Sequence, residues 1–287
     1  MEADIEKKLK DYIKAMPSLP TSVSKVLEIC NNPNTSPADL NHVISLDPVL
    51  VGRVLKLINS AYYGLGQSIT SLVKAIIMLG INTVKNLALS TAVMCQLSAK
   101  SKSPGLDMEG FWRHSLATGV AAKLMAKKRG IDAKLAEEYF TAGLLHDIGK
   151  IPLSAVLSND YMFTLGAGDK ERKPLFRAEE NTLGLDHCTA GGMISAAWKL
   201  NGAIRDVITY HHDYKAYSGE YQDVFFTVVA ANWFVSFSGI GFSGDRYPEK
   251  PGPALWEALN VSPEDFDKIE KTAAAEIEKA EVFLNLR

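Results

Sequence analysis

Two potential metal ligands stand side by side in this sequence, where their neighbours are apolar. They are His146 and Asp147, within the run Leu-Leu-His-Asp-Ile-Gly-Lys that covers residues 144–150. A buried polar pair costs free energy unless hydrogen bonds or a cation satisfy it. Four of the other five histidines lie in separate patches between residues 114 and 212, namely His114, His187, His211 and His212. The sequence therefore predicts a metal site that distant segments assemble.

The side-chain types indicate which ions such a site would bind. Imidazole nitrogen and carboxylate oxygen suit iron, manganese or zinc. We expect one or two divalent transition metal ions (Fe, Mn or Zn), with Asp147 as the bridge between two. Neighbouring helical residues point about 100° apart, so the His-Asp pair and the His-His pair at 211–212 could each line two walls of one cavity. Gly191, one turn after His187, would let another helix approach closely.

Each of these residues also has a purely structural interpretation. A single histidine in an apolar helix, such as His114 or His187, is commonly a hydrogen-bonded core residue. Lys150 is typical of a cation that the dipole favours at a helix terminus, and we expect His42 on the surface. The conjunction of a His-Asp pair with a His-His pair favours the metal site.

Helix start signals are frequent along the chain, whereas alternating strand patterns are scarce, so we expect an all-α fold. Ser36-Pro37-Ala38-Asp39 and Ser262-Pro263-Glu264-Asp265 combine a capping hydroxyl, a proline and an acid, and Asp47-Pro48 opens a third helix. Hydrophobic periodicity predicts further helices over roughly residues 4–15, 21–31, 71–79, 82–99, 108–129, 132–147, 187–200, 203–213, 222–237 and 263–283.

The polar stretch Ala99–Gly105, which contains both proline and glycine, is the best candidate for a boundary. We expect an N-terminal helical lobe over residues 1–100 and a second helical lobe over 101–287 that carries every histidine except His42. Residues 158–177 and 243–253 are expected to be irregular.

Composition narrows the class of protein. With 287 residues and a formal charge of -2, the chain lacks the basic character of a nucleic-acid-binding domain. The three cysteines, Cys30, Cys95 and Cys188, are few and far apart, so they predict neither disulfides nor a Cys-x-x-Cys site. Residues 224–242 carry no charge, but their polar side chains favour a buried core helix over a membrane span. We expect a cytoplasmic protein without a membrane segment.

At this point the residues resemble a known family. The histidines and Asp147 occur in the order typical of HD-domain phosphohydrolases, and residues 144–152 look like the metal-binding core of their HD-GYP branch. Further motifs resemble both halves of the HDOD domain, a regulatory relative, over roughly residues 15–240. They are Leu19-Pro20, Asp47-Pro48, Asn59-Ser60-Ala61-Tyr62-Tyr63-Gly64, Ile69-Thr70-Ser71, Ala75-Ile76, Leu79-Gly80, Gly184-Leu185-Asp186-His187, Gly191, Trp198 and His211-His212.

The resemblance implies an all-helical fold, with an HD-like second lobe, and a role in bacterial signalling. HDOD domains are regarded as regulatory and often lack the metal ligands, whereas this chain keeps six candidates. In HD hydrolases a late aspartate completes the site, and the corresponding stretch here, residues 228–233, places Asn232 there. An amide oxygen brings no negative charge, so a dication would lose electrostatic stabilisation. No Gly-Tyr-Pro motif follows His212.

Two functions from different classes follow. We favour a non-catalytic signalling module with a vestigial or structural metal site, which binds protein partners and has a nucleotide as a candidate ligand. The alternative is a metal-dependent phosphohydrolase acting on a nucleotide or cyclic dinucleotide, with water as the nucleophile, Asp147 bridging the ions and Lys150 holding a phosphate oxygen. A third interpretation has the histidines hydrogen-bonded with no metal.

Overall fold

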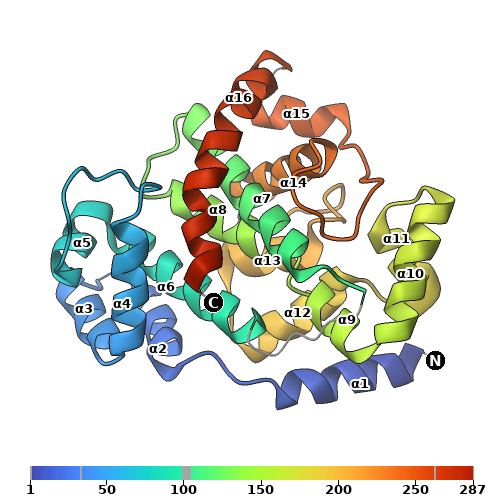
Figure 1. Cartoon of the computed structure of the whole chain (residues 1–287), viewed down its shortest axis with the longest axis horizontal. Helices are drawn as coiled ribbons and strands as arrows, with labels where there is room; N and C mark the ends of the chain where they lie inside the picture. The colour runs from blue at the N-terminus through green and yellow to red at the C-terminus, as the bar shows by residue number, and fades with distance from the viewer. Residues whose placement is uncertain (1, 33, 99–104, 262, 287) are drawn as a thin grey trace.

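The computed structural model describes residues 2–32, 34–98, 105–261 and 263–286 (Figure 1). Within these ranges the regular secondary structure is entirely helical, which confirms the all-α prediction. The predicted boundary at Ala99–Gly105 lies almost wholly outside the described residues, as does the capping residue Ser262. The division into two lobes near residue 100 therefore stays a prediction.

The first part of the chain forms six helices: α1 (Glu2–Ala15), α2 (Thr21–Cys30), α3 (Pro37–Ser45), α4 (Pro48–Ile58), α5 (Leu72–Leu79) and α6 (Ile81–Ser98). The predicted caps at the starts of α3 and α4 are confirmed. Ser36 and Asp39 form a reciprocal capping box, and the Asp47 carboxylate accepts a hydrogen bond from the Leu50 N–H. These caps satisfy amides that the first helical turn leaves free.

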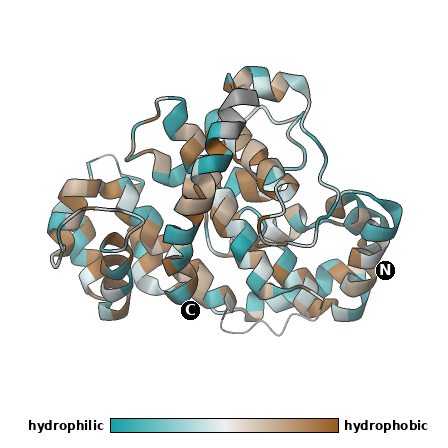
Figure 2. Cartoon of the chain, turned by 45° about the horizontal axis from the view of Figure 1, so that its top comes forward, coloured by the Kyte–Doolittle hydropathy of each residue, from teal (hydrophilic) through white to brown (hydrophobic). Residues whose placement is uncertain are grey.

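The rest of the described chain forms α7 (Met108–Lys128), α8 (Ala136–Leu145), α9 (Lys150–Val156), α10 (Ser158–Glu171), α11 (Leu175–Leu183), α12 (His187–Ala197), α13 (Gly202–Tyr210), α14 (Gln222–Phe237), α15 (Pro253–Leu259), α16 (Pro263–Ala280) and the 3-10 helix η1 (Glu281–Leu286). At its centre, α7 packs against α8 and α14. Hydrophobic and hydrophilic residues are mixed along the helices in Figure 2, and amphipathic helices such as α4 and α13 bury their apolar residues.

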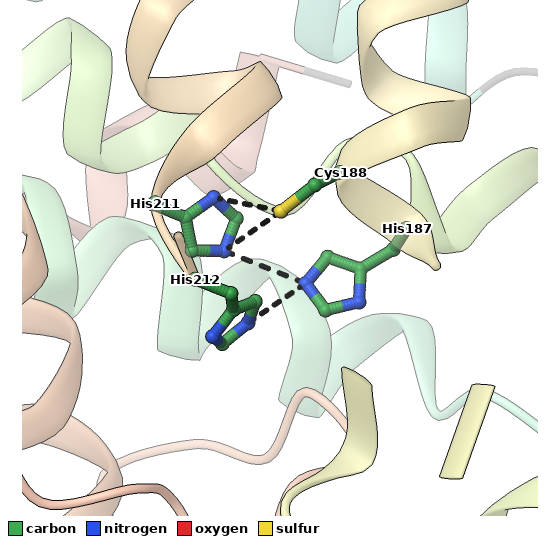
Figure 3. A group of neighbouring side chains, drawn as sticks. All are labelled: His187, Cys188, His211 and His212. Atoms are coloured by element: carbon green, nitrogen blue, oxygen red, sulfur yellow. Dashed lines mark hydrogen bonds between the residues drawn. The ribbon is translucent and has the colours of Figure 1, made fainter. Parts of the chain in front are cut away.

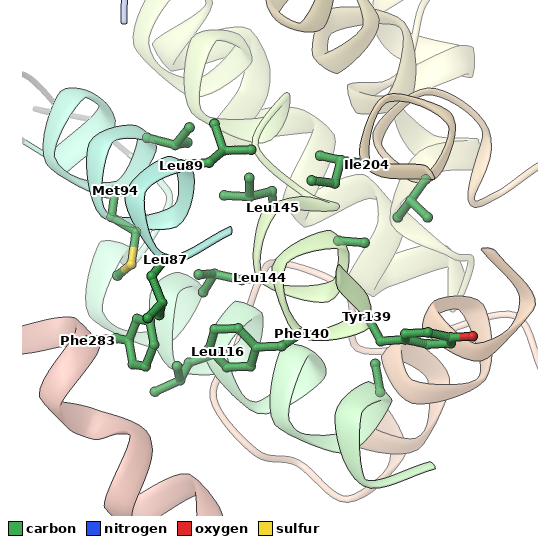
Figure 4. Close-up of a cluster of buried hydrophobic side chains, with 14 of the residues drawn as sticks. Leu87, Leu89, Met94, Leu116, Tyr139, Phe140, Leu144, Leu145, Ile204 and Phe283 are labelled. Atoms are coloured by element: carbon green, nitrogen blue, oxygen red, sulfur yellow. The ribbon is translucent and has the colours of Figure 1, made fainter. Parts of the chain in front are cut away.

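One hydrophobic core joins the first six helices to the later ones. Leu87 and Leu89 of α6 lie beside Leu144 and Leu145 of α8 in the cluster drawn in Figure 4, and Phe283 of η1 packs there too. Each end of the chain also packs against helices from the other half of the sequence. Helix α1 lies along α9 and α12, which belong to the second half of the sequence (Figure 1), while η1 packs against α4 and α6.

The prediction of an irregular segment over residues 158–177 is wrong. Helices α10 and α11 occupy most of it, and they pack against each other. Gly166 and Gly168 weaken the local helix signal, but Tyr161 and Thr164 are fully buried. Tertiary packing therefore overrides propensity here.

The helix predicted over residues 132–147 is shorter than expected. Helix α8 ends at Leu145, and residues 146–149 form a turn before α9 begins. A Cβ atom at Gly149 would collide with the His187 carbonyl oxygen and would lie 2.5 Å from the Gly191 amide nitrogen. The turn is therefore held against the start of α12, in a contact that only glycine permits.

The uncharged segment over residues 224–242 contains most of α14, whose buried residues confirm a core helix. No single helix in the described ranges is long and apolar enough to cross a membrane. Only the pair α5 and α6 meets the length and composition test together, and it is bent by 117°.

Candidate metal centre

The structure brings together all the residues predicted as metal ligands, from five separate segments. Helix α7 carries His114, the turn after α8 carries His146 and Asp147, α12 begins at His187, the residues directly after α13 are His211 and His212, and α14 carries Asn232. His42 is exposed on α3, as predicted.

Asp147 lies between two groups of imidazole rings. Its Oδ2 atom is 3.2 Å from His146 Nε2 and 3.8 Å from His114 Nε2. Its Oδ1 atom is 3.3 Å from His187 Nε2 and 3.6 Å from His211 Nε2. These five residues are buried to within 2% exposure. Each carboxylate oxygen therefore faces its own pair of histidines.

The third histidine of the Oδ1 group is His212, whose Nε2 atom lies 3.1 Å from His187 Nε2. Figure 3 shows His187, His211 and His212 directed toward one another from α12 and from the end of α13. His212 is half-buried and stacks on Phe176, with the ring centroids 4.2 Å apart.

Backbone carbonyls decide which nitrogen of two rings faces the centre. His146 Nδ1 lies 2.7 Å from the Gly143 carbonyl oxygen, and His211 Nδ1 lies 2.9 Å from the Val207 carbonyl oxygen. Because a carbonyl only accepts hydrogen bonds, each Nδ1 carries the proton and donates it. In the neutral rings each Nε2 then presents a lone pair toward Asp147, as metal ligation requires.

The protonation states of the buried groups agree with this geometry. Burial lowers the pKa of His114 to about 3 and that of His211 to about 4, so both rings are neutral near neutral pH. Burial opposes ionisation of Asp147 too, but His146 and Lys150 outweigh it and hold the pKa of Asp147 well below its usual range. The neutral rings of His114 and His211 therefore face an ionised Asp147 carboxylate.

His187 differs from the other rings because a second carboxylate contacts it. Burial alone would lower its pKa, but Glu179 outweighs burial and raises the pKa of His187 to about 9. Glu179 Oε2 lies 2.5 Å from His187 Nδ1, and the Tyr161 hydroxyl donates to Glu179 Oε1 at 2.8 Å. Glu179 thereby orients His187, and a metal ion would have to compete with the proton on its Nε2.

Two buried atoms test whether these residues fit a metal ion. His146 Nε2 and Asp147 Oδ1 have no hydrogen-bond partner. A buried polar atom without a partner costs free energy, and a cation bound on each side of Asp147 would supply one to each of these atoms. The candidate ligands form two sets, and within each set the ligand atoms lie within 4.8 Å of one another. One set contains His114, His146 and Asp147, and the other includes His187, His211 and His212. The residues fit one or two divalent ions.

The interpretation of Lys150 as a cation favoured by a helix dipole is wrong. Lys150 is buried at the first residue of α9, where the dipole disfavours a positive charge. Its ammonium donates to Asp147 Oδ2 at 2.6 Å and to Ser243 Oγ at 3.2 Å. The carboxylate of Asp147 therefore holds Lys150, which neutralises part of the charge that would attract a metal ion.

Asn232 lies on the same side as His114, with its Oδ1 atom 3.0 Å from His114 Nε2. Beside it is a cavity of about 30 Å³, which Lys150, Ser243 and Asp245 also line. Such a volume holds about one or two water molecules. A larger open groove of about 1040 Å³ borders His212 along α11, α12 and α13.

Sequence reasoning missed three residues of the centre. Glu179 lies on α11, a helix that the sequence did not predict, and nothing in its spacing signalled a contact with His187. Cys188 directly follows His187, and its adjacency was the only available signal. Ser243 lies in a segment without helical periodicity, and only the folded chain places it near Lys150.

Comparisons with known proteins agree with this architecture. A model of the HDOD domain matches residues 16–214. An uncharacterised protein of Treponema pallidum is 26% identical over 230 residues, which are 80% of this chain but 44% of that protein. The chain thus spans less than half the length of this curated relative.

Two crystal structures resemble the whole fold. An HDOD domain protein of unknown function from Geobacter sulfurreducens is 24% identical, with a TM-score of 0.75 and coverage of 98% of this chain and 97% of that one. A candidate phosphohydrolase from Shewanella amazonensis is 23% identical, with a TM-score of 0.69 and coverage of 96% and 97%. At these identities the likeness concerns the fold.

Proposed function

The chain belongs to the HDOD domain family, and from this premise we propose that it is a metal-binding signalling module that acts through protein partners and does not hydrolyse a substrate. The observation that carries the metal is the pair of unsatisfied buried atoms, His146 Nε2 and Asp147 Oδ1. An ion on the Oδ2 side would be held by His114, His146 and Asp147, and one on the Oδ1 side by Asp147 with His187, His211 and His212.

What supports a regulatory role is the small volume on the side of the centre where Lys150 and Asn232 lie. The cavity beside Lys150 and Asn232 has a volume of about 30 Å³, whereas small-molecule sites occupy about 300–1,000 Å³. Lys150 is engaged with Asp147, so its ammonium is not directed at a phosphate. Asn232 contributes no charge where a second carboxylate would help to retain an ion.

Exposed apolar side chains support protein partners. Leu46, Val49 and Ile77, near the ends of α3, α4 and α5, are 72%, 61% and 64% exposed. Burying apolar side chains of this size against a partner protein removes apolar surface from water, which favours binding.

A metal-dependent phosphohydrolase is the second candidate, and one observation favours it. Asp147 faces ligands on both sides, an arrangement suited to two ions, which would supply Lewis-acid activation of water. The substrate would be a nucleotide or cyclic dinucleotide. Lys150 would then leave Asp147 to hold a phosphate oxygen, and the loop that contains Ser243 would move to enlarge the cavity.

Metal analysis of untagged protein separates these functions. We expect the wild type and His42→Ala, which removes an exposed histidine, to retain metal, and Asp147→Ala to lose it. Each protein is also assayed on a generic phosphodiester and on cyclic di-GMP. Metal without turnover supports the signalling module, whereas turnover lost in Asp147→Ala supports the hydrolase. A wild-type protein that binds none of Fe, Mn and Zn would contradict both proposed functions.

A further inference from the structure

A cysteine sulfur lies among the histidines of the Oδ1 side. Cys188 is buried directly after His187, and Figure 3 shows its side chain directed toward His211. Its Sγ atom lies 3.9 Å from His211 Nε2 and 3.4 Å from His211 Nδ1. One ligand atom from each of Cys188, His187, His211 and His212 lies within 4.8 Å of the others.

The spacing of these atoms matches the edges of a tetrahedron around one ion. Zinc bonds of about 2.0–2.1 Å to nitrogen and about 2.3 Å to sulfur place tetrahedral ligands about 3.4 Å apart for two nitrogens and about 3.6 Å apart for nitrogen and sulfur. His187 Nε2 lies 3.4 Å from His211 Nε2 and 3.1 Å from His212 Nε2. The sulfur lies 3.9 Å from His211 Nε2 and within 4.8 Å of a ligand nitrogen of each of the other two histidines, close enough for one ion to contact all four.

The surroundings hold two of these four ligands in place. Burial raises the pKa of the Cys188 thiol well above its usual range, so an ion that binds there has to displace the thiol proton. Glu179 orients His187, and the Val207 carbonyl orients His211. Outer partners of this kind are typical of metal ligands.

We propose that Cys188, in place of Asp147, is the fourth ligand of the ion on the Oδ1 side, which makes this a thiolate site with His187, His211 and His212 that prefers Zn²⁺ or a similar ion. On binding, the thiol proton passes to solvent and sulfur donates a lone pair to the ion. The inference rests on the proposed metal binding and deepens it. The Oδ2 side, with His114, His146 and Asp147, has no sulfur among its described ligands, so the two halves of the centre differ in chemistry.

Cobalt substitution tests this proposal because Co²⁺ replaces Zn²⁺ and reports its ligands. Protein stripped of metal is loaded with Co²⁺, and bound metal is counted alongside absorption spectra. We expect a near-ultraviolet band from charge transfer between thiolate and Co²⁺ in the wild type, and its loss in Cys188→Ser. The double variant Cys30→Ser and Cys95→Ser, which alters the two half-buried cysteines of α2 and α6, keeps the band.

X-ray absorption of the zinc-loaded wild type tests the same point without a variant, because sulfur at about 2.3 Å gives its own scattering shell. Bound metal with neither the thiolate band nor a sulfur shell overturns the role of Cys188 but leaves the metal-binding module standing. A band that survives in Cys188→Ser also overturns it. A wild type that binds no metal defeats both proposals.

Discussion

The two oxygens of Asp147 face different histidines, so one carboxylate supplies the negative charge on both sides of the centre. The Lys150 ammonium donates to this carboxylate at 2.6 Å, and the protonated ring of His187 lies 3.3 Å from its Oδ1 atom. The imidazoles around the carboxylate bring no negative charge. The number of carboxylates, more than the number of nitrogens, therefore decides how firmly a dication is held.

Asn232→Asp is expected to tighten metal binding on the Oδ2 side by about tenfold, which corresponds to about 1.4 kcal/mol. The new carboxylate would lie near His114 Nε2, which is 3.0 Å from the present amide oxygen. Competition for Mn²⁺ with a chromophoric chelator measures the change. Asn159→Asp, at an exposed position of α10, is the matched control. Equal or weaker affinity in Asn232→Asp would contradict the placement of Asn232 at the ion.

At the scale of elements, the centre depends on close contacts between helices that carry glycine. Gly149 allows the turn after α8 to lie against α12. A Cβ atom on Gly191 would stand 2.6 Å from Ile208 Cγ2 of α13, so this glycine lets α12 and α13 approach, as its place one turn after His187 predicts. Helix α11 adds Glu179 from outside the ligand set and so fixes the ring of His187.

Glu179→Gln is expected to lower metal affinity by about 10–100-fold, the range for outer partners of ligating histidines. The substitution replaces the carboxylate with a neutral amide. The ring of His187 then loses the charged partner that orients it and makes its Nε2 atom a stronger ligand. Glu180→Gln is a close control, since the neighbouring Glu180 is exposed and pairs only with Arg177 among the described contacts. Zinc titrations of both variants measure the difference. Equal losses in the two would mean that α11 acts through its overall charge.

For the whole molecule, the continuous core predicts that the two lobes unfold together. Residues from Ile13 to Leu286 share one hydrophobic cluster, and η1 packs against α4 and α6. Local unfolding of one half would expose this shared surface, which costs free energy.

Urea unfolding followed by two probes checks this prediction. All four tryptophans, Trp112, Trp198, Trp233 and Trp256, lie after residue 100, so their fluorescence reports the second half of the chain, whereas far-ultraviolet circular dichroism reports all the helices. We expect the two transitions to coincide. A circular dichroism transition at lower urea than the fluorescence transition would show that the first lobe unfolds by itself.

The sequence by itself determined the helical class, the caps of α3 and α4, and the kinds of side chain available for a metal, because caps and hydrophobic periodicity are local properties. Only the tertiary structure decided that Lys150 pairs with Asp147, that Glu179 supports His187, that Cys188 lies beside His211, and which nitrogen of His146 faces the carboxylate. Those contacts arise where separate helices pack, and packing depends on the shapes of distant segments that no local pattern encodes.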